Sequence, residues 1–270
     1  MEQPQESAQS PQEPPAPARR NIKLVIAYNG AAYHGWQRQI AGVDTVQERM
    51  EQALCRVVRH PVIVSGASRT DAGVHAAGQV ANFRTTNFAI PLEGLRRAVN
   101  SRLPRDIAVM SAAEVAEDFH ASRCAAGKTY RYRICVCPIM PVELAGQVYH
   151  YWRPLEAAPM AQAAALLVGT HDFRGFTTSM EVRENSVRTI FRCEVAEAER
   201  EIHITVQGDG FLYNMVRNIV GTLIEIGRGH WGREQIDKII QSRDRGQAGP
   251  TAPPDGLTLV CVHYDKVEVD

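Results

Sequence analysis

The sequence predicts an α+β protein made of two ferredoxin-like halves, each with the element order βαββαβ and antiparallel or mixed sheets, with a cleft between the halves. The first observation is an alternation of apolar and polar residues in several short stretches, a period of two that indicates strands. The second is that segments with apolar residues at helical spacing lie between these stretches. The third is that the whole order of elements recurs in the second part of the chain.

The first half opens on a strand in which Ile22, Leu24 and Ile26 share a face. A helix follows with Thr45 as its N-cap, because a threonine hydroxyl can accept a hydrogen bond from a free backbone N–H of the first turn. A second helix opens at Pro91, whose fixed φ suits a first helical turn. The expected elements are strand 21–28, helix 45–60, strands 62–67 and 79–85, a helix from 91, and strand 107–111.

The second half begins with a strand that places Tyr130, Tyr132 and Ile134 on the face opposite Arg131 and Arg133. Setting two additional elements aside, the remaining order is again βαββαβ. The expected elements are strand 128–137, a short strand 148–152, helix 160–168 ended by Gly169 as its left-handed cap, strands 187–197 and 201–207, helices 211–226 and 234–242, and strand 257–264.

The first 20 residues are rich in Pro, Gln and Glu, so we expect a disordered tail over residues 1–20. The repeated element order divides the rest into an N-terminal half over 21–115 and a C-terminal half over 116–270. The formal net charge is zero, from 30 basic and 30 acidic residues, so a site for a polyanion must come from local clustering. The six cysteines show no zinc-ribbon spacing, which favours reduced thiols. No apolar run suits a membrane span, and we expect a cytoplasmic protein.

The stretch from Ser65 to Phe83 is expected to form a glycine-rich loop between two strands, with Arg69 and Asp71 at its centre. Its glycines permit close backbone approach to a ligand. An Asp in such a sequence commonly forms an Asx-turn or a helix cap, so the residues alone leave a structural role beside a nucleophilic one. Arg217 lies within an apolar helical segment, where a long cation either reaches solvent or meets a carboxylate across a cleft.

Several stretches together resemble one family, the bacterial tRNA pseudouridine synthase A family, and they occur in the family's order from about residue 22 to the C-terminus. The stretches are Tyr28-Asn29-Gly30, Gly35-Trp36-Gln37-Arg38-Gln39, Arg69-Thr70-Asp71-Ala72-Gly73-Val74-His75-Ala76, Gly78-Gln79-Val80, Asp106-Ile107-Ala108-Val109, Phe119-His120-Ala121, Lys128-Thr129-Tyr130-Arg131-Tyr132, His171-Asp172-Phe173, Gly210-Phe211-Leu212, Met215-Val216-Arg217-Asn218-Ile219-Val220-Gly221 and Ala252-Pro253-Pro254.

The resemblance implies an isomerase that converts uridine to pseudouridine at positions 38, 39 and 40 of the tRNA anticodon arm, as a homodimer with no cofactor and no metal. It implies that Asp71 is the nucleophile, that Arg217 pairs with it, and that Tyr130 stacks on the target base. It also implies that Arg69 contacts the RNA.

Three further arginines, Arg38, Arg131 and Arg133, are candidate backbone contacts. The last two fit equally well as the solvated face of their strand. Two aromatic residues near Arg38 are Tyr33 and Trp36. They suit unstacked bases, but they suit the edge of a core as well.

Two residues depart from the family pattern. Ser68 stands where the family usually has Gly, which would strain the loop if this position required a positive φ. Ser122 stands where the family often has Arg, and the adjacent Arg123 could replace it. Two other functions fit the same residues: a module that only binds structured RNA, and a glycosidic hydrolase in which water completes the reaction.

Overall fold

The structure is a computed structural model that describes residues 18–178 and 185–265. Ten strands are present in it: β1 (Arg20–Tyr28), β2 (Ser65–Gly66), β3 (His75–Thr85), β4 (Ile107–Val115), β5 (Gly127–Val136), β6 (Tyr149–Tyr151), β7 (Gly169–Asp172), β8 (Val187–Ala198), β9 (Glu201–Gly208) and β10 (Leu257–His263). Among the described residues, no helix is long and apolar enough to cross a bilayer.

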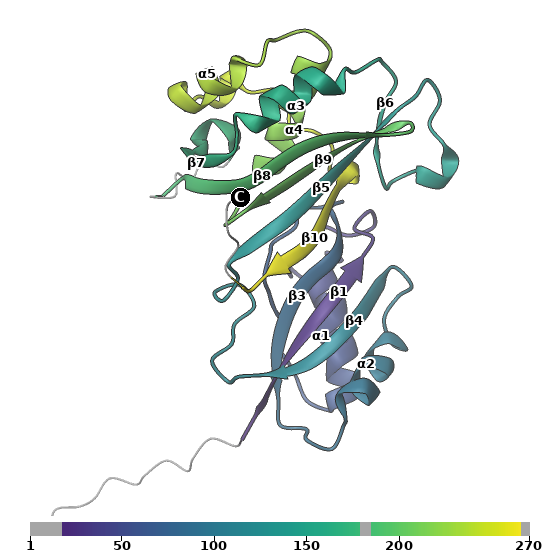
Figure 1. The fold of residues 1–270 in the computed structure, drawn as a ribbon. Helices are drawn as coiled ribbons and strands as arrows, with labels where there is room; N and C mark the ends of the chain where they lie inside the picture. Colours follow the sequence, from purple (N-terminus) through teal and green to yellow (C-terminus); the bar gives the residue numbers. More distant parts are fainter. Residues whose placement is uncertain (1–17, 179–184, 266–270) are drawn as a thin grey trace, which may run out of the picture.

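All these strands join into one 10-stranded mixed sheet, with the order β4-β1-β3-β10-β5-β9-β8-β7. Strand β2 pairs with β3, and β6 pairs with β5. The α+β class is therefore confirmed, and the sheets of the two expected halves are continuous. Strand β10 makes the junction, because it runs parallel to β3 on one side and antiparallel to β5 on the other (Figure 1).

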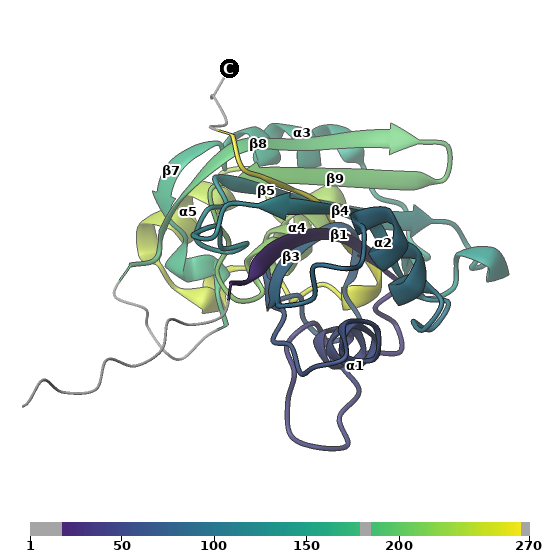
Figure 2. The same cartoon turned by 90° about the horizontal axis from the view of Figure 1, so that it is seen from below.

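Five α-helices accompany the sheet: α1 (Val46–Val58), α2 (Leu92–Asn100), α3 (Ala157–Ala165), α4 (Met215–Gly227) and α5 (Gln235–Ser242). Helix α1 lies on one side of β1 and β3 when the molecule is seen from below (Figure 2). Helix α3 packs on β8 and on α4. The predicted cap is present, since the Thr45 side chain accepts from the backbone N–H of Glu48.

The core contains the faces that the alternation predicts. Ile22, Leu24 and Ile26 of β1 are almost completely buried, as are Tyr132 and Ile134 of β5. Residues two apart in a strand point to the same side, so each strand contributes one continuous apolar face. Burial of these faces is the main favourable contribution to the stability of the sheet.

Four local expectations differ from the structure. Strand 62–67 is reduced to β2, and β3 begins at His75 instead of residue 79. The left-handed cap expected at Gly169 is wrong, because α3 ends at Ala165 and Gly169, with φ +115°, opens the additional strand β7. Helix α4 begins at Met215 instead of residue 211, because Asn214 has a left-handed conformation, φ 58°, that a right-handed helix does not continue.

Most of the expected tail, residues 1–20, lies outside the described residues, and its last residue, Arg20, is the first residue of β1. The division of the chain near residue 115 stays a prediction.

Candidate active site

The loop that carries Asp71 connects β2 to β3 and is held by hydrogen bonds to β1 and to the segment around Trp36. The Thr70 carbonyl accepts a hydrogen bond from the Trp36 backbone N–H at 3.0 Å. The Thr70 hydroxyl lies 2.7 Å from the Tyr28 hydroxyl. Gly35 is required beside it, since its φ is +91° and a Cβ there would lie 2.6 Å from the Thr70 carbonyl oxygen. These contacts fix the backbone from which Asp71 projects.

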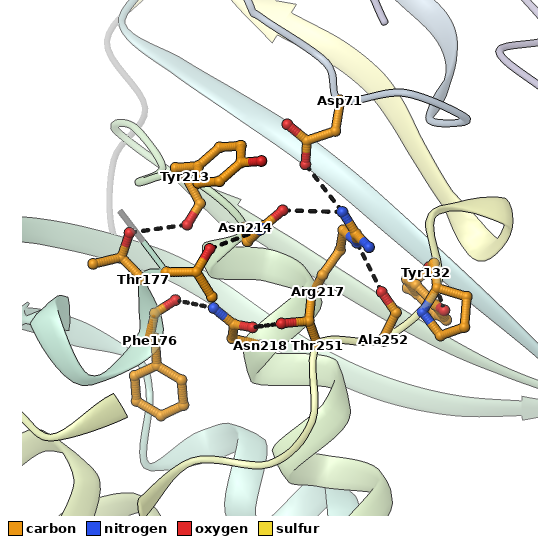
Figure 3. Close-up of polar contacts among 12 residues, drawn as sticks. Asp71, Tyr132, Phe176, Thr177, Tyr213, Asn214, Arg217, Asn218, Thr251 and Ala252 are labelled. Carbon is orange, nitrogen blue, oxygen red and sulfur yellow. Dashed lines mark hydrogen bonds and ion pairs between the residues drawn. The ribbon is translucent and has the colours of Figure 1, made fainter. Parts of the chain in front are cut away.

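The Asp71 carboxylate faces Arg217 of α4 across the cleft, with 3.3 Å between Oδ2 and Nη1 (Figure 3). Arg217 Nε donates to the Ala252 carbonyl at 2.7 Å, and Nη1 also donates to Asn214 Oδ1 at 3.0 Å. The Arg217 side chain is only 16% exposed and that of Asp71 25%. Arg217 therefore reaches a carboxylate across the cleft instead of extending to solvent, which decides between the two orientations left open by the sequence.

The position of α4, which carries Arg217, is stabilised by the next residue along the helix. Its neighbour Asn218 is fully buried, donates to the Phe176 carbonyl at 2.7 Å and accepts from the Thr251 hydroxyl at 2.7 Å (Figure 3). A buried amide with its hydrogen-bonding groups satisfied rigidifies the helix around it. The helix that carries Arg217 is therefore held by contacts independent of Asp71.

Burial raises the pKa of Asp71 above its ordinary value, and the charge and hydrogen bond of Arg217 oppose that change without cancelling it. The carboxylate is thus poorly solvated and has one cation as its main compensation. A carboxylate with little solvation and a defined orientation is a suitable nucleophile or charge stabiliser.

Tyr130 lies on β5 and lines the same cleft as Asp71. Its hydroxyl is 2.7 Å from the Ser68 hydroxyl, and its ring meets Phe211 edge-on with 5.3 Å between ring centroids. Burial, the largest cause, raises the pKa of Tyr130 to about 12. The phenol is therefore neutral near pH 7, and the side chain offers a flat, oriented ring.

The cleft has a volume of about 1090 Å³ and receives residues from both halves of the chain. This size is at the upper end of ordinary small-molecule sites. Three cations, Arg69, Lys128 and Arg174, line it together with Arg217, while Asp71 is the only lining carboxylate among the described residues. The cleft therefore combines one reactive acid with a surplus of positive charge suited to a polyanion.

The other predicted arginines lie outside the lining of this cleft. Arg38 pairs with Glu51 at 2.8 Å, and Arg133 makes two hydrogen bonds to Glu201 at 2.8 and 2.7 Å. Arg131 is exposed on β5, on the face opposite Tyr130. Of the nearby aromatic residues, Trp36 is 1% exposed, so it belongs to the core.

Two cleft cations received no role from the sequence. Lys128 shares a strand face with Tyr130, and burial, with a smaller contribution from Arg188, lowers its pKa. The Arg174 Nε atom is buried without a hydrogen-bond partner in the described part of the chain. The period of two in β5 would have identified Lys128, whereas nothing in the sequence around Arg174 distinguishes it. Within residues 18–178 and 185–265, no three His, Cys, Asp or Glu side chains are grouped in a way that could hold a metal ion.

Comparison with known proteins gives consistent matches. The family model described as tRNA pseudouridine synthase matches residues 24–122 and 163–265. A protein of Clostridium perfringens named tRNA pseudouridine synthase A 2 is 45% identical over 245 residues, which cover 91% of this chain and 100% of the relative. A protein of Acetivibrio thermocellus named tRNA pseudouridine synthase A is 46% identical, with the same coverage of both chains.

Proposed function

The chain belongs to the tRNA pseudouridine synthase family, and from this we propose that it isomerises uridine to pseudouridine at positions 38, 39 and 40 of the tRNA anticodon arm, with Asp71 as nucleophile. The single observation that carries the role of Asp71 is its pairing with Arg217, at 3.3 Å, in a cleft that Tyr130 also lines.

The reaction breaks the bond between C1′ and N1 of the uridine, turns the base, and joins C1′ to C5, from which a proton then leaves. A carboxylate can assist by adding to C6 of the uracil or by acting at C1′ as the uracil departs. Both routes require Asp71 to be ionised although burial disfavours the charge. Arg217 supplies the opposing charge and cannot itself deprotonate, which suits it to hold Asp71 ionised.

Tyr130 has the role of a stacking platform. The uracil must remain in the site while it is detached from the sugar, and a flat ring beside Asp71 retains it by stacking. The raised pKa of the phenol, about 12, disfavours a role as the base that removes the C5 proton near pH 7.

A uridine in the anticodon stem must leave the helix before it reaches Asp71, at a cost of a few kcal/mol. Contacts to the RNA backbone offset this cost. We assign the contacts inside the cleft to Arg69, Lys128 and Arg174, which line it. The outer arginines, Arg38, Arg131 and Arg133, remain candidates for contacts to flanking RNA. The homodimer and the cytoplasmic location remain predictions.

The test replaces Asp71 by Asn or by Ala and maps pseudouridine in a tRNA that carries uridines at the three positions. We expect both variants to bind the tRNA and to form no pseudouridine. The matched control is Asp237→Asn, an exposed carboxylate on α5, which should react at the wild-type rate. Full activity of Asp71→Asn would refute the role of this carboxylate.

The same experiment separates the alternative functions. A binding module would shift the tRNA on a gel and leave every uridine intact. A hydrolase would release free uracil and leave an abasic ribose, which chromatography of the small products detects.

A further inference from the structure

Ser68 and Tyr130 make a buried hydrogen bond that joins the two sides of the cleft. Their hydroxyl oxygens are 2.7 Å apart, and each residue is 7% exposed. We propose that Ser68 is a positioning residue for Tyr130, which fixes the stacking ring relative to Asp71. This inference rests on the proposed function, since it concerns how the ring meets the uracil.

Ser68 is itself held firmly. The Gln79 side chain accepts from the Ser68 backbone N–H at 3.2 Å and donates to the Ser68 carbonyl at 2.7 Å. Gln79 is fully buried in β3. Ser68 is not among the non-glycine residues with positive φ, so the strain considered for a Ser at this position is absent. The backbone of Ser68 is therefore held in place, so its hydroxyl can orient another group.

A second residue, Phe211, also contacts the Tyr130 ring. Phe211 meets the ring at an interplanar angle of 90°, with 5.3 Å between the ring centroids. The hydrogen bond at the hydroxyl restrains the far end of the same ring. The two contacts together restrain the Tyr130 side chain, and an oriented partner speeds a reaction by keeping it near the productive geometry.

The hydrogen bond also crosses between the parts of the site. Tyr130 belongs to β5, whereas Gln79, which holds the Ser68 backbone, belongs to β3. Strand β10 lies between these two strands. Ser68 is three residues before Asp71 in the same loop. The distance between the carboxylate and the stacking ring is therefore set partly by one serine hydroxyl.

Removing that hydroxyl leaves a buried phenol without its partner. Ser68→Ala should lower kcat by up to roughly fivefold to thirtyfold, the limit reached if the whole cost of the unpaired buried phenol is felt in the transition state. KM should change less than threefold, because the RNA contacts that dominate affinity lie elsewhere. Tyr130→Phe removes the same hydrogen bond from the other partner and replaces Ser68→Ala if that variant does not fold.

The decisive measurement is a double-mutant cycle on kcat with Ser68→Ala, Tyr130→Phe and the double variant. Each single change removes the same hydrogen bond, so the double variant should be no slower than the slower single variant. The control, Ser111→Ala, removes an exposed hydroxyl on β4 and should leave kcat unchanged. Wild-type kcat in Ser68→Ala, or effects that multiply in the double variant, would overturn the proposal.

Thermal unfolding of the same four proteins separates this inference from the proposed function. A shared hydrogen bond should make the shifts in Tm non-additive whatever reaction the protein catalyses. If the wild-type protein formed no pseudouridine, the function would fail while the coupling could still be observed. If only kcat were insensitive to Ser68, the positioning role would fail and the function would stand.

Discussion

Replacing Arg217 by Gln should remove the charge that opposes the burial of Asp71. The pair is neither exposed nor fully buried, with side chains 16% and 25% exposed. Exposed pairs contribute about 0.2–1 kcal/mol, whereas breaking a buried pair costs about 3–5 kcal/mol. An intermediate loss of roughly 2–3 kcal/mol corresponds to a fall in kcat/KM of roughly 30- to 160-fold, if the loss is felt fully in the transition state.

The pH dependence gives this prediction a second readout. Burial already raises the pKa of Asp71, and Arg217 lowers it. Without the guanidinium the pKa should rise further, so the acid limb of the kcat/KM profile should move to higher pH. The assay follows release of tritium from C5-labelled uridine in an anticodon-arm RNA, because C5 exchanges its proton for the new glycosidic bond.

The control carries the same substitution in an exposed pair. Arg192 and Glu194 form an ion pair on β8 with side chains 57% and 51% exposed, so Arg192→Gln should stay close to wild type. The reasoning would be refuted if Arg217→Gln kept kcat/KM within about threefold of wild type with an unmoved acid limb.

Three further results are expected. Lys128→Gln should raise KM for RNA and reduce the slope of log affinity against log salt by about 0.7, the value for one phosphate contact on a single strand. Asp71→Asn should have a Tm at neutral pH at least equal to that of the wild type in calorimetry, because the pKa of Asp71 is raised in the folded protein and its ionised form is therefore costly. The difference in Tm should vanish at a pH below 3.8, the ordinary pKa of the carboxyl, where the wild-type side chain is protonated in both states. Gly221→Ala should lower the free energy of unfolding in urea by at least about 1–3 kcal/mol, since its Cβ would lie 1.7 Å from the Pro250 carbonyl oxygen.

Local periodicity was sufficient to predict most elements. The alternation in β1 and β5 and the cap at Thr45 are properties of neighbouring residues, and each is present in the structure. Strand β7 was missed because its four residues, Gly169–Asp172, are too few to establish an alternation. The start of α4 was misplaced because the left-handed conformation of Asn214 depends on its surroundings and not on the apolar spacing that follows.

The site was predictable in its members and less so in its contacts. The sequence identified Asp71 and Arg217 but left the direction of the arginine side chain open, because that direction depends on a carbonyl acceptor, Ala252, 35 residues away. It treated Ser68 as a departure from a pattern, whereas the structure gives it a partner, Tyr130, that lies 62 residues further along the chain. Contacts between distant segments leave no periodicity for a sequence to display.

The last strand explains how a site divided between two halves can be rigid. Just before β10, the Ala252 carbonyl accepts from Arg217 Nε, and the Ala252 N–H donates to the Arg217 carbonyl. Three residues later the Asp255 carbonyl lies 3.1 Å from His75 Nε2, at the start of β3 and four residues after Asp71. The same segment therefore holds the elements of both charged partners and then pairs with both β3 and β5. Displacement of β10 should therefore separate Asp71 from Arg217, and because β10 lies between β3 and β5 it should occur only when the centre of the sheet opens.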